Sequence, residues 1–146
     1  MSHSGYFAEV EYVKLHSDAQ EPHRTHEGDA GNDLKALEGF TIHPKETILV
    51  KTGIALAVPN HCVGLVKTRS STAKRGIFTT GGVIDHGYTG ECGVLLNNLG
   101  DHPVTFEKGD KVAQIVFMPI VEATFKEVQS LGSSTRGTGG FGSTGK

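Results

Sequence analysis

A single aspartate in TTGGVIDHGYTGECGVLLNN, residues 79–98, stands in a setting suited to proton transfer. Asp85 directly follows the apolar pair Val83 and Ile84, and a carboxylate in a partly enclosed pocket can accept a proton from an attacking water. Tyr88, three residues on, offers a flat face for a sugar or a base. An ordinary hairpin explains the pattern equally well, with an Asp that stabilises its own turn and glycines at the reversals.

Two further acids, Asp29 and Asp33 in GDAGNDLKAL, flank a glycine at the start of an apolar run. Carboxylates in turns commonly hydrogen-bond their own backbone, which is the simpler explanation. Two acids close together could equally hold the water shell of Mg²⁺, because this ion keeps several waters and is often shared with substrate phosphates. The spacing alone leaves both explanations open.

Two internal stretches could bind an anion. In KTRSSTAKRGI, Arg69, Ser70 and Ser71 stand at the start of a short helical turn. There an arginine fork, hydroxyls and free backbone N–H groups suit phosphate oxygens, although a capped helix with a solvated arginine fits as well. In KGDKVAQIVFMP, Gln114 interrupts an apolar strand. A buried amide must find partners, which are more often protein groups than a ligand.

The end of the chain, GFGSTGK, has the letters of a nucleotide-binding P-loop. A P-loop continues into a helix whose N-terminus faces the phosphates, whereas Lys146 is the last residue here. We therefore do not expect a P-loop. Arg136 and the glycines around it still supply a cation and a backbone that could wrap around an anion. A flexible Gly/Ser tail is the alternative.

Length and composition fit one globular domain with no nucleic-acid or membrane partner. The chain has 146 residues and a formal net charge of -2, so it has no basic field for a nucleic-acid backbone. It shows no signal peptide and no run long enough to span a membrane, and we expect a cytoplasmic protein. Cys62 and Cys92 lie in apolar runs and are expected as free thiols. A metal site on them, or on His23 and His26, is not expected.

Short β-strands must position these residues. Segments rich in apolar, β-branched and aromatic residues, some alternating with period two, recur between turn signals and predict strands at 6–15, 47–52, 54–59, 62–68, 93–98, 104–108, 111–120 and 123–128. At the start, Ala8, Val10 and Tyr12 would share one face of a strand. Only SSTAKRG, residues 70–76, is suited to a turn or two of helix. The spacing favours an all-β sandwich or barrel of jelly-roll type.

Five segments, AGNDLKA, RSSTAKRGI, GGVIDHGYTGE, GDKVAQIV and RGTGGFGSTG, closely resemble the ordered motifs of the trimeric dUTP pyrophosphatase (dUTPase) family. The resemblance runs from about residue 9 to the end. It implies a jelly-roll domain over 1–131, a glycine-rich lid over 132–146, and a homotrimer whose three active sites are each built from all three subunits. It also implies Mg²⁺-dependent hydrolysis of dUTP to dUMP and pyrophosphate, which limits uracil in DNA and supplies dUMP for dTMP synthesis.

The resemblance also implies roles for individual residues. Asp85 matches the general base that activates water for attack on the α-phosphorus, and Asp33 matches the acid that steadies the water shell of the metal. Tyr88 matches the aromatic ring under the deoxyribose, and backbone groups of Val83 and Gly93 match those that read the uracil edge. The other matched positions contact phosphates or, for the phenylalanine, stack on uracil: Arg69, Ser70, Ser71, Gln114, Arg136, Phe141, Gly142, Ser143 and Thr144.

The chain departs from the family pattern at a few positions. Thr79 and Thr80 stand where many relatives carry an Asn that can touch uracil, so base contacts at that edge are open. Ser71 replaces a common glycine, and His86 beside Asp85 has no assigned role.

Two alternatives to a dUTPase remain. The related dCTP deaminases use a glutamate at the position of Leu95 and an arginine near the position of Lys74, and the chain has neither. A catalytically inactive binding protein is the second alternative. The chain keeps the matched base, metal acid and tail, which favours an enzyme.

Overall fold

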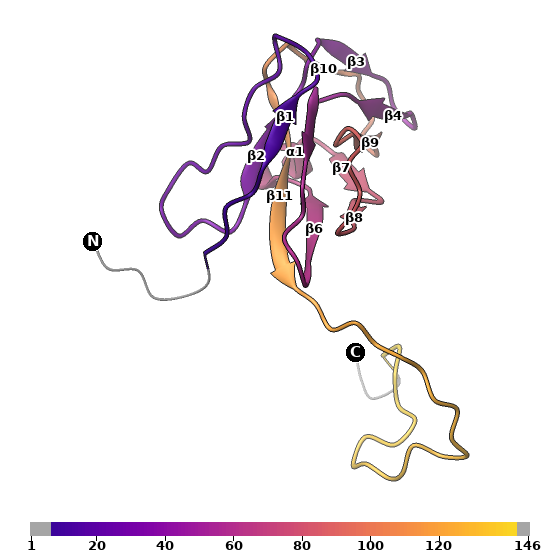
Figure 1. The fold of residues 1–146 in the computed structure, drawn as a ribbon. Coiled ribbons are helices and arrows are strands. Elements are labelled where there is room, and N and C mark those ends of the chain that lie inside the picture. Colours follow the sequence, from indigo (N-terminus) through magenta and orange to yellow (C-terminus); the bar gives the residue numbers. More distant parts are fainter. Residues whose placement is uncertain (1–6, 143–146) are drawn as a thin grey trace.

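Short strands and one helical turn make up the computed structural model, which describes residues 7–142 (Figure 1). Period-two segments supply most strands, because alternate side chains of a strand face opposite sides. In chain order the elements are β1 (Tyr12–Lys14), β2 (Asn32–Lys35), β3 (Phe40–Ile42), β4 (Thr47–Val50), β5 (Ile54–Leu56), β6 (Cys62–Lys67), α1 (Ser70–Lys74), β7 (Ile77–Thr80), β8 (Val83–Ile84), β9 (Val94–Asn98), β10 (Val104–Phe106) and β11 (Lys111–Pro119).

The strands form antiparallel sheets around one apolar core. The largest has the order β2-β11-β6-β8, a second has β4-β9-β7, and the pairs β1-β5 and β10-β3 complete the set. In β9, alternate residues point into the core, so Val94 and Leu96 are buried while Leu95 is exposed. The expected all-β jelly-roll class with one short helix is confirmed, and its core includes Leu34, Ile42, Ile54, Phe106, Val112 and Ile115.

Strand β6 organises the regions where function is expected. On one side it pairs with β11, with Gln114 opposite Lys67, and on the other with β8, with Ile84 opposite Gly64. Past its end the chain stays extended through Arg69, whose φ is -81° and ψ 145°, and then enters α1. Residues near both ends of β6 are therefore held by a central strand.

The structure confirms the strands expected within 47–68, 93–98 and 104–120 and the helix at 70–76. Two expectations were wrong. Residues 123–128 form no strand, and β1 begins only at Tyr12, so the strand face proposed for Ala8 and Val10 does not exist. Residues 123–128 form no strand because a β-strand needs a neighbouring strand to pair with, and no strand of residues 7–142 pairs with them.

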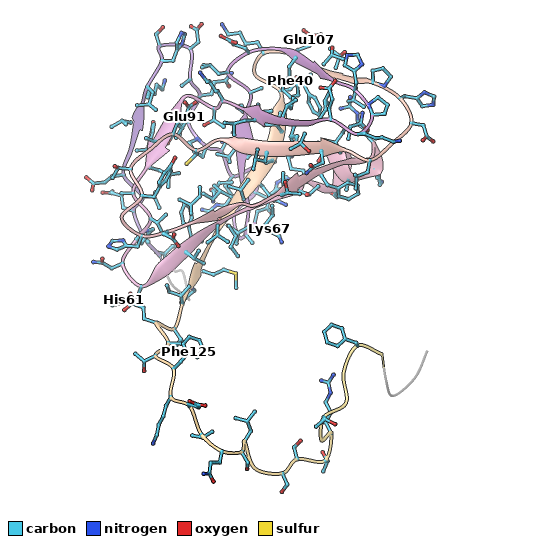
Figure 2. All side chains as sticks on the ribbon, turned by 90° about the vertical axis from the view of Figure 1, so that its right-hand side faces the viewer. Phe40, His61, Lys67, Glu91, Glu107 and Phe125 are labelled. Carbon is cyan, nitrogen blue, oxygen red and sulfur yellow. The ribbon has the colours of Figure 1, made fainter. Side chains whose placement is uncertain are left out.

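Beyond β11 the chain leaves the sheets and runs outward as an extended arm, residues 120–142 (Figures 1 and 2). Its large apolar side chains face solvent, with Val121 90% exposed and both Phe125 and Leu131 98% exposed. Figure 2 shows Phe125 below the strands and away from the core. The arm therefore has no apolar packing of its own at these positions.

Both cysteines are free thiols, as expected, with Cys92 buried and Cys62 half-buried. Burial, and secondarily the charge of Glu91, disfavours the thiolate and raises the pKa of Cys92 from 9.0 to about 11. Within the described residues, no helix has the length and apolar character needed to cross a membrane.

Candidate active site

Charged side chains gather where β2, β11 and the end of β6 meet. Arg69 Nε donates to Asp33 Oδ1 at 3.2 Å, and Lys111 Nζ lies 3.3 Å from Asp33 Oδ2. Arg69 Nη1 donates to the backbone oxygen of Lys111 at 3.4 Å. Two cations around one acid leave a net charge of +1 at neutral pH, so this group, called here the Arg69 cluster, suits an anion.

Gln114 lies beside the Arg69 cluster. It faces Asp33 across the β11–β2 pair, and its Nε2 donates to the Thr68 oxygen at 3.2 Å. A Cβ at Gly31 would overlap Gln114 Oε1, so a larger residue there would displace the Gln114 amide from its present position. Ser70 and Ser71 are exposed at the start of α1, directly after Arg69. The structure therefore brings together the residues for which phosphate contacts were expected within the folded domain.

Asp29 and Asp33 do not act as a pair. Asp29 Oδ2 accepts from the His26 backbone N–H at 3.0 Å, which closes its own turn. Asp33 lies within β2, and its backbone exchanges hydrogen bonds with His23. The turn explanation therefore holds for Asp29, and only Asp33 belongs to the Arg69 cluster.

A second group of matched residues surrounds a cavity of about 290 Å³ at the hairpin that follows β8. The hairpin contributes a carboxylate, an aromatic ring and open backbone, while β4 and β9 contribute leucines. The lining includes Leu49, Val83, Asp85, Tyr88, Gly93 and Leu95. An apolar wall with a few polar groups at one edge is typical of a site for a small organic ligand.

Local hydrogen bonds make this hairpin rigid. Tyr88 Oη donates to the Glu91 backbone oxygen at 2.8 Å, and the Tyr88 backbone N–H donates to the Asp85 oxygen at 3.1 Å. The Glu91 carboxylate accepts from the Gly53 backbone N–H at 2.8 Å, which ties the hairpin to the start of β5. A Cβ at Gly93 would lie 2.6 Å from Leu49 Cδ1, so a larger residue there would push the Leu49 side chain aside. The ring of Tyr88 is thus fixed at the rim.

Asp85 lies at the open edge of the cavity. Asp85 is exposed in the single chain, whereas the role of a base was conditional on a partly enclosed pocket. The neighbouring His86 holds the turn, because its Nδ1 lies 2.8 Å from the Val58 oxygen. Among the described residues, Asp85 is therefore open to solvent on one side.

The two groups lie toward opposite ends of β6. Ile84 pairs with Gly64 and Val83 with Leu65, so the chain at Asp85 continues toward the start of β6 while Arg69 follows its end. The register separates Arg69 and Asp85 by six residue steps, or about 20 Å along an extended strand. Within one chain, the Arg69 cluster and the candidate base Asp85 therefore lie too far apart to act on the same phosphorus atom.

The arm does not complete either group in the single chain. Arg136 Nε donates to the Gly139 oxygen at 2.7 Å within the arm, and the ring of Phe141 is fully exposed. Gly142 follows Phe141 at φ 77°, whereas Ser143 and Thr144 lie outside the described residues. None of the described arm residues lines the hairpin cavity.

The threonines that replace the usual Asn have structural partners. The Thr79 backbone N–H donates to Thr68 Oγ1 at 2.9 Å, and the two hydroxyls lie 3.1 Å apart. Thr80 Oγ1 accepts from Asn97 Nδ2 at 3.0 Å. Their side chains connect β7 to Thr68, directly after β6, and to β9.

Direct metal ligation has little support in the described part of the chain. There, no group of three or more His, Cys, Asp or Glu side chains could hold a metal ion. Asp33 is a lone acid whose two oxygens already face cations. This donor set fits Mg²⁺ only through water and alongside the phosphates of a nucleotide, because Mg²⁺ retains waters and binds few protein carboxylates.

Sequence reasoning missed Lys111, Glu91 and a larger cavity. Lys111 was visible as the basic residue three positions before Gln114, but its contact with Asp33 depends on the bulge in the β11–β2 register. Glu91 gave no signal apart from its place in the hairpin. The further cavity, about 720 Å³, lies between the N-terminal segment and β11 and is lined in part by Tyr12, Arg24 and Phe117.

Comparison with known proteins decides the family. The dUTPase family model matches residues 17–145. The chain belongs to the dUTPase family. It is similar to the deoxyuridine 5'-triphosphate nucleotidohydrolase of Anaeromyxobacter sp. (strain Fw109-5), with 49% identity over 82% of this chain and 84% of that protein. It is 44% identical to the enzyme of that name from Clostridium tetani, over 90% of this chain and 93% of that protein.

Solved dUTPase structures share the fold. The dUTPase of Staphylococcus bacteriophage 80alpha with dUpNHpp bound has a TM-score of 0.89 and 29% identity, covering 94% of this chain and 99% of that one. A variant dUTPase from phage phi11 of S. aureus, described with a structural Mg(II) ion, has a TM-score of 0.80 and 26% identity, covering 86% of this chain and all of that one. The fold of this chain is therefore the fold of solved dUTPases, in agreement with the family match.

Proposed function

We propose that this protein hydrolyses dUTP to dUMP and pyrophosphate in a homotrimer whose active sites are shared between subunits. As a member of the dUTPase family the chain is a dUTP diphosphatase. Relatives named deoxyuridine 5'-triphosphate nucleotidohydrolase cover most of its length. Beyond this activity, we propose the assembly, the roles of individual residues and the metal.

The separation of Arg69 from Asp85 carries the proposal of shared sites. The two residues lie about 20 Å apart along β6 in one chain, yet a base must come within hydrogen-bond reach of the water that it activates. Phosphate groups bound by the Arg69 cluster of one subunit can reach Asp85 only if a neighbouring subunit supplies Asp85. The exposed edge of the hairpin cavity suits such a neighbour.

Asp85 acts as the general base in this proposal. Its backbone oxygen accepts from Tyr88, and the neighbouring His86 is tied to Val58, so the turn that carries the carboxylate is held from two sides. A carboxylate fixed in this way removes a proton from water as the water attacks the α-phosphorus in line. The bond to the bridging oxygen breaks, and pyrophosphate leaves.

The Arg69 cluster, Ser70, Ser71 and Gln114 bind the phosphates. Their cationic and hydroxyl groups supply charge-assisted hydrogen bonds to phosphate oxygens. Asp33 would hold Mg²⁺ through water, and the ion would neutralise negative charge on the phosphates. The solved phage phi11 relative described with a structural Mg(II) ion supports a metal in the family.

The hairpin cavity recognises the nucleoside. Tyr88 packs under the deoxyribose and leaves no room for a 2′-hydroxyl, and its ring is fixed by the bond to Glu91. Backbone groups of Val83 and Gly93 pair with the uracil edge. Cytosine reverses a donor and an acceptor there, so the wrong base leaves polar groups unpaired, which costs binding free energy.

The C-terminal arm closes the site. We divide the chain into a jelly-roll domain, 1–131, and a lid, 132–146. In the closed state Arg136 clamps the γ-phosphate and Phe141 stacks on uracil, with Gly142, Ser143 and Thr144 as further phosphate donors. The full exposure of Phe141 in the single chain suits a ring that packs on a partner's substrate.

Product analysis with dUTP, dCTP, dTTP and UTP in the presence of Mg²⁺ tests the activity. We expect pyrophosphate and dUMP from dUTP alone. Deamination of dCTP would indicate the related deaminase chemistry instead, although exposed Leu95 supplies no acid at the matched position. Binding of dUTP without any release of pyrophosphate would indicate an inactive binding protein. In the cell, the reaction would limit uracil incorporation into DNA and supply dUMP.

A further inference from the structure

The carboxylate of Asp33 is occupied by protein cations on both sides. Its Oδ1 accepts from Arg69 Nε at 3.2 Å, and its Oδ2 lies 3.3 Å from Lys111 Nζ. Thr25 Oγ1 also donates to Oδ2 at 3.4 Å. With the Asp33 side chain only 13% exposed, these contacts are the main surroundings of the carboxylate. Asp33 therefore interacts directly with other side chains of the protein.

Arg69 is held at two points of its fork. Nε–H is directed to Asp33 and one Nη1–H to the Lys111 backbone oxygen. A guanidinium has five N–H donors in a rigid plane, so two are taken and three stay available in directions that the first two set. A donor set fixed before the ligand arrives loses less conformational freedom on binding. The fork is oriented for a bidentate anion such as phosphate.

We propose that Asp33 is a positioning residue for Arg69, and that this effect on nucleotide binding does not require a metal. The inference rests on the proposed role of Arg69 in phosphate binding, and it gives Asp33 a task besides any contact with the water shell of Mg²⁺. Lys111 takes part in two ways. Its ammonium offsets the charge of Asp33, and its backbone oxygen fixes the second point of the guanidinium.

Three explanations of Asp33 predict different results when its charge is removed. If only charge mattered, an uncharged residue 33 would bind a triphosphate more tightly, because a negative group beside an anion is unfavourable. If Asp33 acted only through Mg²⁺, affinity would change only with the metal present. If Asp33 orients Arg69, affinity falls even in EDTA. The sign and the metal dependence therefore separate the three.

Isothermal titration of the full-length protein with dUpNHpp, in EDTA and in MgCl₂, makes this comparison. We expect Asp33→Asn to weaken binding on the order of tenfold in EDTA, about the effect of losing one charge-assisted hydrogen bond. Equal or tighter binding in EDTA would overturn the inference. Circular dichroism checks that the asparagine variant folds. If it does not, Asp33→Ser, which also removes the charge and is smaller than aspartate, gives the same test.

A double-mutant cycle tests whether Asp33 acts through Arg69. Arg69→Lys keeps a positive charge but has no planar fork for Asp33 to orient. In that background, Asp33→Asn should weaken dUpNHpp binding in EDTA by less than about twofold, because the two changes remove one shared function. A full tenfold loss in both backgrounds would show that Asp33 does not act through Arg69.

Asp18 supplies the matched control. It forms an exposed ion pair with Lys108 at 2.6 Å and bonds to no member of the Arg69 cluster, and Asp18→Asn changes the net charge by the same amount. We expect its affinity to equal that of the parent. If the parent protein does not bind dUpNHpp at all, the proposed function itself is contradicted. If the parent binds dUpNHpp and Asp33→Asn binds it equally well, only the role of Asp33 is contradicted.

Discussion

Mixing two inactive variants tests whether the active sites are shared between chains. Asp85→Asn removes the proposed base, and Arg69→Ala removes the proposed phosphate contact, so each homotrimer should be nearly inactive. If one site takes Asp85 from one subunit and Arg69 from its neighbour, a mixed trimer can rebuild intact sites. An Arg69→Ala chain then supplies Asp85, and an Asp85→Asn chain supplies Arg69.

The expected recovery follows from random assembly. With equal amounts of the two variants, an intact Asp85 and an intact neighbouring Arg69 each occur with a chance of about one half, so about one quarter of sites are complete. Loss of a general base alone typically leaves a rate lower by about 10² to 10⁴. A quarter of the parental rate would therefore stand far above the background of either variant.

The assay is pyrophosphate release from dUTP after the two variants are unfolded together and refolded. Refolding of parental protein alone gives the yield, and light scattering gives the mass of the assembly. A mixture of Asp85→Asn with the double variant Asp85→Asn/Arg69→Ala is the control, because no chain in it carries the base. A mixed sample no more active than the two variants measured apart would place both groups in one chain's site and refute the argument from β6.

Four further results are expected. Asp85→Asn should bind dUpNHpp at near-parental affinity while turnover falls by about 10² to 10⁴; parental turnover would place the base elsewhere. Deletion of the residues after Leu131 should leave a folded trimer with little activity, and an unchanged rate would contradict the lid. Asn98→Ala should lower the free energy of unfolding by about 2 to 4 kcal/mol in urea titrations, because the fully buried amide bonds Ile42, His102 and Gly100. Since folding raises the pKa of Cys92 from 9.0 to about 11, the unfolded thiol ionises first and stability should fall as pH rises from about 9 to 11; Cys92→Ala should flatten that part of the profile.

Much of the fold could be predicted because its central strands alternate or run continuously apolar. Residues 93–98 and 111–120 gave β9 and β11 almost to their bounds. By contrast, β8 has only two residues and β2 carries Asp33 and Lys35, so neither has a clear period. The error at 123–128 has another origin, since a strand-like pattern does not say whether a partner edge exists in the same chain.

The candidate site was predictable in its residue types and less so in its geometry. The motif containing Arg69 and the hairpin containing Asp85 were visible in the sequence, and in the structure each forms a local group. Lys111 was not assigned, because its place beside Asp33 depends on a bulge between two strands far apart in sequence. The distance between the two groups depends on the register of β6 with β8, which residue patterns do not encode.

The exposed apolar side chains of the arm after β11 also affect the stability of a newly synthesised chain in the cell. In the single chain, Val121, Phe125 and Leu131 form an exposed apolar stretch, of the kind that chaperones bind and proteases cut; in the proposed trimer, neighbouring subunits would cover it. An orphan subunit released from the ribosome would thus be vulnerable at the segment that leads to the lid. Cellular turnover would remove unassembled copies and preserve completed enzyme.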